Sequence, residues 1–233
     1  MTAALALLTV LGRAREPTAR AWRWFPLVGA AIGALLGGVW WLSDRAFPPL
    51  VAATLVVVAD LAVTGMLHFD GLADSADGLL PHATRPERLR IMRTPDVGAF
   101  GVVAVATVLL LRVAALSAQS VSIVLIAAVW CASRTVVAST PRFISYARDE
   151  GIVSSLLGSP ASAWLLVALV PAGGVAALAV GFRGAATVTA TVVGAAGVGA
   201  LAKRRIGGFT GDVLGAGIVV GETVGLVVAA AKW

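Results

Sequence analysis

Long apolar runs joined by short basic loops constrain this chain more than any other feature of its sequence. A helix needs roughly 20 mainly apolar residues to cross a bilayer. Seven runs approach that length, at about 25–43, 49–67, 98–116, 119–138, 160–181, 184–202 and 212–231. Backbone groups in lipid must pair with one another, which favours helices for all seven. We therefore expect one all-α membrane domain over residues 1–233, a transmembrane bundle of about seven spanning helices with a range of six to eight.

Composition argues against a soluble domain. Charged residues make up 13% of the chain, whereas soluble domains carry about 25%. The net charge of +6 does not indicate a nucleic-acid partner, because the Lys and Arg residues lie in the loops between the apolar runs. Basic loops of this kind are a topology signal. We therefore expect a lipid bilayer as a partner and no nucleic acid.

The basic loops also give the orientation. With the N-terminus in the cytoplasm, fourteen Lys and Arg residues fall on the cytoplasmic side, Arg134 near that face among them, and only Arg45, Arg112, Arg183 and Lys232 fall on the other. Such an excess marks the cytoplasmic side. The three longest polar segments, at about 68–97, 139–159 and 203–212, then face the cytoplasm, and we expect them to be the active-site loops.

Three acidic residues recur at helical spacing just after the second apolar run. Asp70, Asp74 and Asp77 stand at i, i+4 and i+7, within about 60° of one another on a helix. Carboxylates this close repel unless a cation lies among them, and oxygen ligands suit Mg²⁺, which also binds phosphates. We expect these residues to bind Mg²⁺ and to act in catalysis, with ligand and base unassigned. The alternative is solvated acids in an irregular loop, because Gly71 and Gly78 disfavour a helix.

Two further acids, Asp60 and Glu222, lie inside apolar runs. An acid within the bilayer is costly and is a functional candidate by default. For Asp60 the structural alternative is a buried hydrogen bond between helices or an ion pair with Arg134. Glu222 has a similar alternative.

The loop before the last run combines basic residues with glycines. Gly207, Gly208 and Gly211 let the backbone approach an anion, and amides at the start of a helix bind phosphate. Asp212 then falls at the N-terminus of that helix, either as a metal ligand or as a plain N-cap. The basic triplet at 203–205 either holds phosphate or only sets the topology.

Other candidates lie nearby. Arg142 and Arg148 can grip a phosphate through paired hydrogen bonds, or they only mark the cytoplasmic interface. His68 would point away from the Asp70 face on an ideal helix, which favours a structural role for this histidine.

The segment from His68 to Gly78, HFDGLADSADG, resembles the signature of the cobalamin synthase family. The segment GFTGDVLGA at 208–216, followed by Glu222, is similar to that family's C-terminal motif. Residues 25–29, Met92-Arg93 with 98–101, and 146–148 match in the same order, so that the resemblance covers about Leu8 to Glu222. The chain departs from the pattern at Asp96, which stands later than the expected acid, and the roles of Asp96 and Asp60 stay open.

The resemblance implies an enzyme of the prokaryotic cytoplasmic membrane whose active site faces the cytoplasm. It implies transfer of adenosylcobinamide phosphate from adenosylcobinamide-GDP to α-ribazole or its 5′-phosphate, with release of GMP and with Mg²⁺ as cofactor. Motifs and resemblance together predict the metal ligands Asp70, Asp74, Asp77, Asp212 and Glu222. They predict the substrate-binding residues His68, Arg93, Arg142, Tyr146, Arg148, Gly208, Thr210 and Gly211. A homo-oligomer or an association with other enzymes of cobalamin biosynthesis stays open.

Two other functions compete. A CDP-alcohol phosphotransferase also holds metals with aspartates at helix ends, but its motif continues with Ala-Arg after the second acid, whereas this chain continues Asp77-Gly78-Leu79. A cation- or proton-coupled transporter would use Asp60 and Glu222 as a relay. Transporters of that kind usually carry inverted repeats with sites at the midplane, whereas the acids here gather at one membrane edge.

Overall fold

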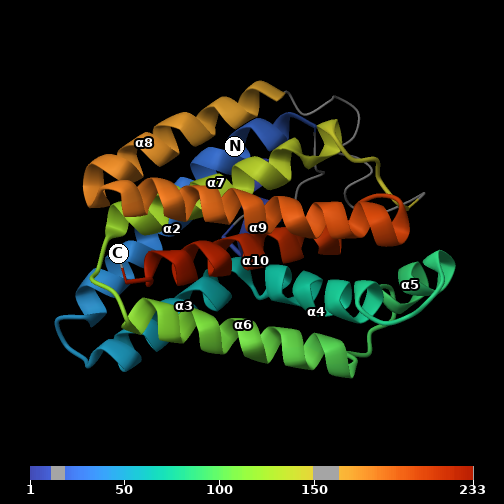
Figure 1. Ribbon diagram of the computed structural model, residues 1–233, viewed down its shortest axis with the longest axis horizontal. Coiled ribbons are helices and arrows are strands. Elements are labelled where there is room, and N and C mark those ends of the chain that lie inside the picture. Colours follow the sequence, from blue (N-terminus) through green and yellow to red (C-terminus); the bar gives the residue numbers. More distant parts are fainter. Residues whose placement is uncertain (12–18, 149–162, 233) are drawn as a thin grey trace.

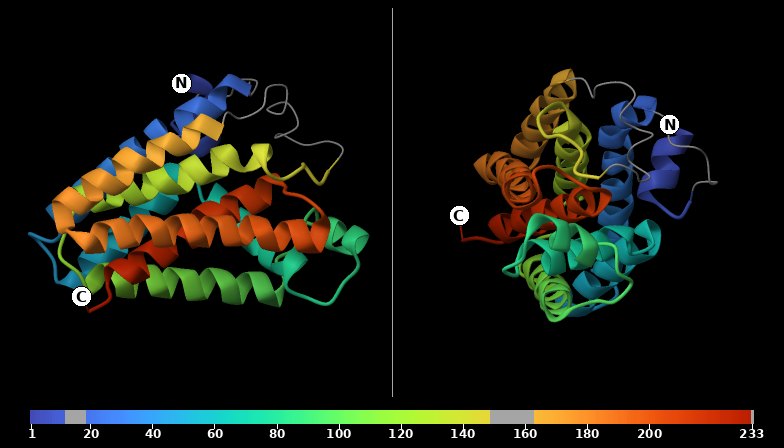
Figure 2. Two further views of the ribbon diagram at one scale, coloured as in Figure 1. Left: turned by 45° about the horizontal axis from the view of Figure 1, so that its top comes forward. Right: turned by 90° about the vertical axis from the view of Figure 1, so that its right-hand side faces the viewer.

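The computed structural model describes residues 1–11, 19–148 and 163–232, so that the loop predicted at 139–159 lies partly outside the described residues. The α-helices are α1 (Thr2–Leu8), α2 (Phe25–Ser43), α3 (Pro49–Thr64), α4 (Leu67–Leu79), α5 (Arg85–Ile91), α6 (Ala99–Ser117), α7 (Ile123–Ser139), α8 (Leu169–Val180), α9 (Phe182–Ile206) and α10 (Gly211–Ala229). Short 3₁₀ segments are η1 (Ala19–Trp24), η2 (Thr140–Arg142) and η4 (Ala163–Ala168). The long helices lie side by side along the long axis of the molecule (Figure 1, Figure 2).

Five helical stretches in the described part are long and apolar enough to cross a membrane: Arg20–Ser43, Ala99–Ser117, Ile123–Arg142, Phe182–Ile206 and Gly211–Ala229. The pair α3–α4 makes a sixth if it is taken as one bent span, and Leu165–Val180 is a shorter apolar stretch within the run predicted at 160–181. The predicted all-α membrane bundle is confirmed. Its five or six candidate spans lie at or below the lower limit of the predicted range of six to eight.

The second predicted span, 49–67, is broken. The axes of α3 and α4 meet at 91°. Gly65 and Met66 at the break have positive φ values of 60° and 61°, a left-handed conformation that ends an α-helix. The prediction of a polar loop over 68–97 is therefore wrong in part, because α4 and α5 fill much of it. The bend turns the acidic segment against the bundle as a helix of its own.

Glycines set how closely the helices pack. Gly29, Gly33 and Gly37 on α2 face α7, and a Cβ at Gly33 would lie only 2.7 Å from the Cα of Ala127. Small residues at such contacts let membrane helices approach backbone to backbone.

Candidate active site

Two helices bring acidic side chains together at one end of the bundle. Asp70 and Asp74 lie on α4, and Asp212 lies in the first turn of α10. A Cβ at Gly71 would stand only 2.8 Å from the carbonyl oxygen of Asp212, so that glycine is needed for this contact between α4 and α10. As a result, Asp212 and Asp70 are the two acids whose charges act most strongly on Asp74. We call Asp70, Asp74 and Asp212 the acidic group.

Asp77 shares α4 but makes a different contact. Its carboxylate oxygens accept hydrogen bonds from the backbone amides of Gly98 and Gly101, at 2.7 and 3.0 Å. These amides open α6, and the positive end of a helix dipole favours a negative charge there. The helical face predicted for the acidic run is confirmed, because α4 spans Leu67–Leu79. Asp77, however, holds the start of α6.

Backbone pairing joins two of the predicted active-site loops. The Ala147 amide donates to the Phe209 carbonyl and the Phe209 amide donates to the Ser145 carbonyl, each at 2.9 Å. The Tyr146 and Phe209 rings meet edge to face with their centroids 5.5 Å apart. Partial burial raises the pKa of the Tyr146 phenol, which keeps it a neutral hydrogen-bond donor. These contacts therefore join the described part of the 139–159 loop and the 203–212 loop into one unit.

Arg148 connects this unit to the acidic group. Its Nη2 donates to Asp212 Oδ2 at 2.8 Å and to the Met92 carbonyl at 3.0 Å. The Thr210 hydroxyl donates to the same Asp212 oxygen at 3.1 Å and accepts from the Val213 amide at 3.3 Å. Thr210 is thus the N-cap of α10, and the interpretation of Asp212 as a plain N-cap is wrong. The Asp212 carboxylate is left at the front of the helix.

The other predicted phosphate-binding residues are placed less closely. Arg93 and Arg142 are exposed, and the positive charge of Arg93 opposes part of the rise in the pKa of Tyr146. A Cβ at Gly208 would collide with the Ser145 carbonyl, so that this glycine serves the pairing of the two loops. Within the described residues no contact brings Arg142 to the acidic group.

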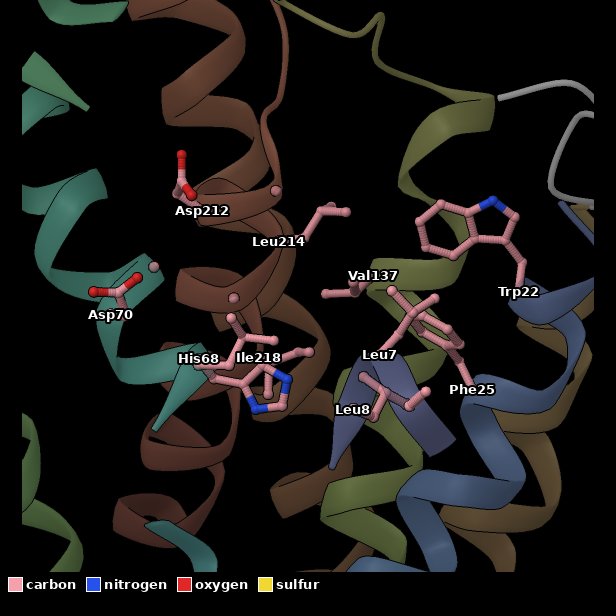
Figure 3. A pocket seen from close by; sticks show the side chains of 15 residues that line it. Leu7, Leu8, Trp22, Phe25, His68, Asp70, Val137, Asp212, Leu214 and Ile218 are labelled. Atoms are coloured by element: carbon pink, nitrogen blue, oxygen red, sulfur yellow. The ribbon is translucent and has the colours of Figure 1, made fainter. Parts of the chain in front are cut away.

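A cavity of about 290 Å³ lies beside the acidic group (Figure 3). It is lined by Ala6, Leu7, Leu8, Trp22, Phe25, Leu67, His68, Asp70, Gly71, Val137, Gly211, Asp212, Leu214, Gly215 and Ile218. Asp70 and Asp212 stand on one side, whereas Leu7, Leu8 and Phe25 stand across from them. His68, which we expected to face away from Asp70, lines the same cavity. Sequence reasoning missed this cavity, because its apolar wall combines residues of α1, η1, α2, α7 and α10 that lie far apart in the chain.

The two acids inside the apolar runs belong to a separate ion-pair network in the core. Arg112 pairs with Asp60 and with Glu222 at 2.7 Å each, and Arg134 also pairs with Glu222. All four side chains are at most 6% exposed. Arg112, which the charge count assigns to the outer side, and Arg134, which it assigns near the cytoplasmic face, are therefore both buried in the core. The structural alternative for Asp60, a buried hydrogen bond between helices, is confirmed: Asp60 accepts hydrogen bonds from Arg112 and from the Trp130 indole. Its ion-pair partner is Arg112 and not Arg134. The signal was present: each arginine interrupts an apolar run.

The acidic group offers carboxylate oxygens, the kind of donor that Mg²⁺ prefers. Among the described residues, no three His, Cys, Asp or Glu side chains converge into a complete metal site. Mg²⁺ needs no such cage, because it keeps several waters and takes one or two carboxylates together with substrate phosphates. Glu222 follows Asp212 by ten residues on α10, about 15 Å at the helical rise. The structure therefore does not bring Glu222 to the acidic group.

Comparisons with known proteins show the family of the chain. A family model described as cobalamin-5-phosphate synthase matches residues 1–230. A relative named adenosylcobinamide-GDP ribazoletransferase, from Ralstonia nicotianae, is 38% identical over 215 residues, which cover 88% of this chain and 82% of the relative. A relative with the same name from Prosthecochloris aestuarii is 34% identical over 231 residues, which cover 91% of this chain and 88% of the relative. Another from Escherichia coli K12 is 36% identical over 208 residues, which cover 87% of this chain and 84% of the relative. No solved structure gives a significant match. With its acidic helix, its glycine loop and the match along nearly its whole length, the chain belongs to the cobalamin-5-phosphate synthase family.

Proposed function

We propose that the acidic group is the centre of an adenosylcobinamide-GDP ribazoletransferase that works at the cytoplasmic face of the membrane. The reaction transfers adenosylcobinamide phosphate from adenosylcobinamide-GDP to α-ribazole or its 5′-phosphate and releases GMP. The relatives' name supports these substrates. The observation that carries the site is the glycine contact at Gly71, because it sets Asp70 and Asp74 beside Asp212 and Arg148.

The chemistry is a displacement at phosphorus. A ribose hydroxyl of the acceptor attacks the phosphorus on the cobinamide side of the diphosphate, and the bond from that phosphorus to the oxygen of GMP breaks. The bonding electron pair leaves with GMP. When bound, Mg²⁺ would neutralise the diphosphate and the charge on the leaving GMP. Asp70, Asp74 and Asp212 are the residues that would hold it.

The chain's own groups supply the remaining tasks. Asp70 lines the cavity and is exposed, so that it can accept the proton of the attacking hydroxyl. Arg148 is held at the acidic group and can turn its guanidinium to a phosphate. The amides that open α10 provide a site for a second phosphate oxygen.

Cytoplasmic orientation rests on the charge distribution of the loops. The unit formed by the 145–147 and 207–212 segments carries the exposed Lys203, Arg204 and Arg205 at its edge. These basic residues support binding of an anionic donor from the cytoplasmic side, where basic loops accumulate.

GMP release from adenosylcobinamide-GDP in inverted membrane vesicles tests the proposal. Release should require α-ribazole and Mg²⁺ and should stop on chelation. Asp74→Asn should abolish turnover while the protein still inserts into the membrane, whereas the exposed Asp44→Asn should retain it. Full activity of the Asp74 variant, or activity in excess chelator, would overturn the proposed centre.

The transporter alternative depended on Asp60 and Glu222 as a relay. Both carboxylates are engaged by buried arginines, which disfavours a mobile proton or ion site there. The same vesicles separate the two functions, because a transporter would move ions without forming GMP.

A further inference from the structure

We propose that the cavity beside the acidic group binds the aromatic base of the acceptor, with its ribose directed to Asp70 and Asp212. This inference rests on the proposed function and adds a binding site for one substrate. The chemical class of the ligand is a bicyclic, largely apolar heterocycle such as a benzimidazole.

The size of the cavity selects among the parts of the two substrates. Pockets for drug-sized ligands measure about 300–1,000 Å³, and this cavity, of about 290 Å³, lies just below that range. It has room for a two-ring base. A corrin macrocycle with its peripheral amides is far larger and has to stay outside.

The chemistry of the apolar part of the wall disfavours the guanine of the donor. Leu8, Phe25, Val137 and Ile218 are each 4% exposed or less and present only apolar atoms. Guanine carries donors and acceptors around its whole edge, and each one left without a partner in such a wall would be costly. A dimethylbenzimidazole has two methyl groups and one free ring nitrogen, which suits a mostly apolar wall.

One polar side chain meets the base inside the apolar part. His68 is 5% exposed, and its ring lies beside Ile218 in the cavity (Figure 3). An imidazole N–H can donate to the unsubstituted nitrogen of a benzimidazole. The histidine therefore gives the base one orienting contact and leaves the faces of the rings to apolar packing.

The two ends of the cavity fix the direction of the ligand. Asp70 and Asp212 bound one side, and the leucines of α1 with Phe25 bound the other (Figure 3). A riboside bound with its base among the apolar residues presents its sugar to the carboxylates. That places the attacking hydroxyl next to the proposed proton acceptor. A lipid acyl chain has no polar atom that could pair with His68.

The test places a large side chain in the cavity from α1, the short helix that forms part of its wall. Leu8→Trp on the short helix α1 should raise the KM for α-ribazole at least about tenfold, the effect of displacing one well-packed group. The KM for adenosylcobinamide-GDP should change less than twofold. Leu178→Trp makes the same substitution on a side chain that is 90% exposed on α8, and it should change neither constant.

A binding measurement separates this inference from the proposed reaction. Equilibrium dialysis of labelled α-ribazole against the solubilised full-length protein in EDTA needs no turnover. The wild type should bind, Leu8→Trp should bind at least about tenfold more weakly, and unlabelled benzimidazole should compete. If the wild type releases no GMP yet binds in this way, the reaction fails and the site stands. Unchanged dialysis for Leu8→Trp, with competition only by added phospholipid, would overturn the site. If that variant does not insert, Val137→Phe fills the same cavity from α7, with the same expected result.

Discussion

Gly71→Ala should disable the active site while leaving the bundle folded. The added Cβ would stand 2.8 Å from the carbonyl oxygen and 3.1 Å from the Cα of Asp212, both backbone atoms. Ordinary van der Waals contact begins at 3.4 Å, so α4 and α10 have to part by about 0.6 Å. Overpacking of this kind typically costs about 1–3 kcal/mol. Helix propensity acts the other way, because Ala is about 1 kcal/mol better than Gly within a helix.

The consequence for catalysis exceeds the consequence for stability. A displacement near 1 Å of groups that position a reaction can cost about a hundredfold in rate, and this separation moves Asp70 and Asp74 relative to Asp212. We expect kcat for GMP release to fall by about ten- to a hundredfold, with membrane insertion retained. The matched control is Gly38→Ala on α2, where a Cβ meets nothing within 4 Å. Wild-type kcat for Gly71→Ala would show that the close contact between the two helices plays no part in the reaction.

Three further outcomes follow from the contacts described. Asp77→Ala leaves two backbone amides without an acceptor, so the free energy of unfolding should fall by about 1–3 kcal/mol and the melting temperature in detergent should drop. The Mg²⁺ concentration for half-maximal activity should stay the same. A higher Mg²⁺ requirement would show that Asp77 is a metal ligand. Arg148→Lys should raise the KM for adenosylcobinamide-GDP about ten- to a hundredfold, the equivalent of about 1.5–3 kcal/mol for a hydrogen bond to a charged group, and steady-state kinetics with an unchanged KM would refute its role. Arg112→Met should destabilise the bundle by about 3–5 kcal/mol, because it strands buried carboxylates, whereas the exposed Arg45→Met should not; equal melting curves for the two would contradict the network.

Sequence patterns predicted the parts of this molecule that depend on local composition. Apolar length identified the spans, and the spacing of Asp70 and Asp74 predicted one helical face, as α4 shows. The break before α4 was missed, because two consecutive left-handed residues, one of them Met66, leave no mark in hydropathy. The packing of α4 against α10 was also missed, because hydropathy does not show which helices are neighbours.

The site shows a similar division. The motifs pointed to the segments around Asp70 and Asp212, whose proximity depends on a contact between residues far apart in the chain. They could not tell that Asp77 would hold α6, because its partners are backbone amides and any residue supplies those. The charge count did not predict that Arg112 is buried, because such a count takes no account of an acidic partner within the membrane.

The buried ion pairs also bear on how the protein is made. Their members come from α3, α6, α7 and α10, in that order along the chain. During synthesis Asp60 enters first, the two arginines follow, and Glu222 arrives only with the final helix. Until then the nascent bundle holds two positive charges and one negative charge, an imbalance that is expensive in hydrocarbon. A chain that stops before α10 should therefore pack incompletely and be degraded by membrane proteases. Insertion of the last helix would then be the step that completes the assembly.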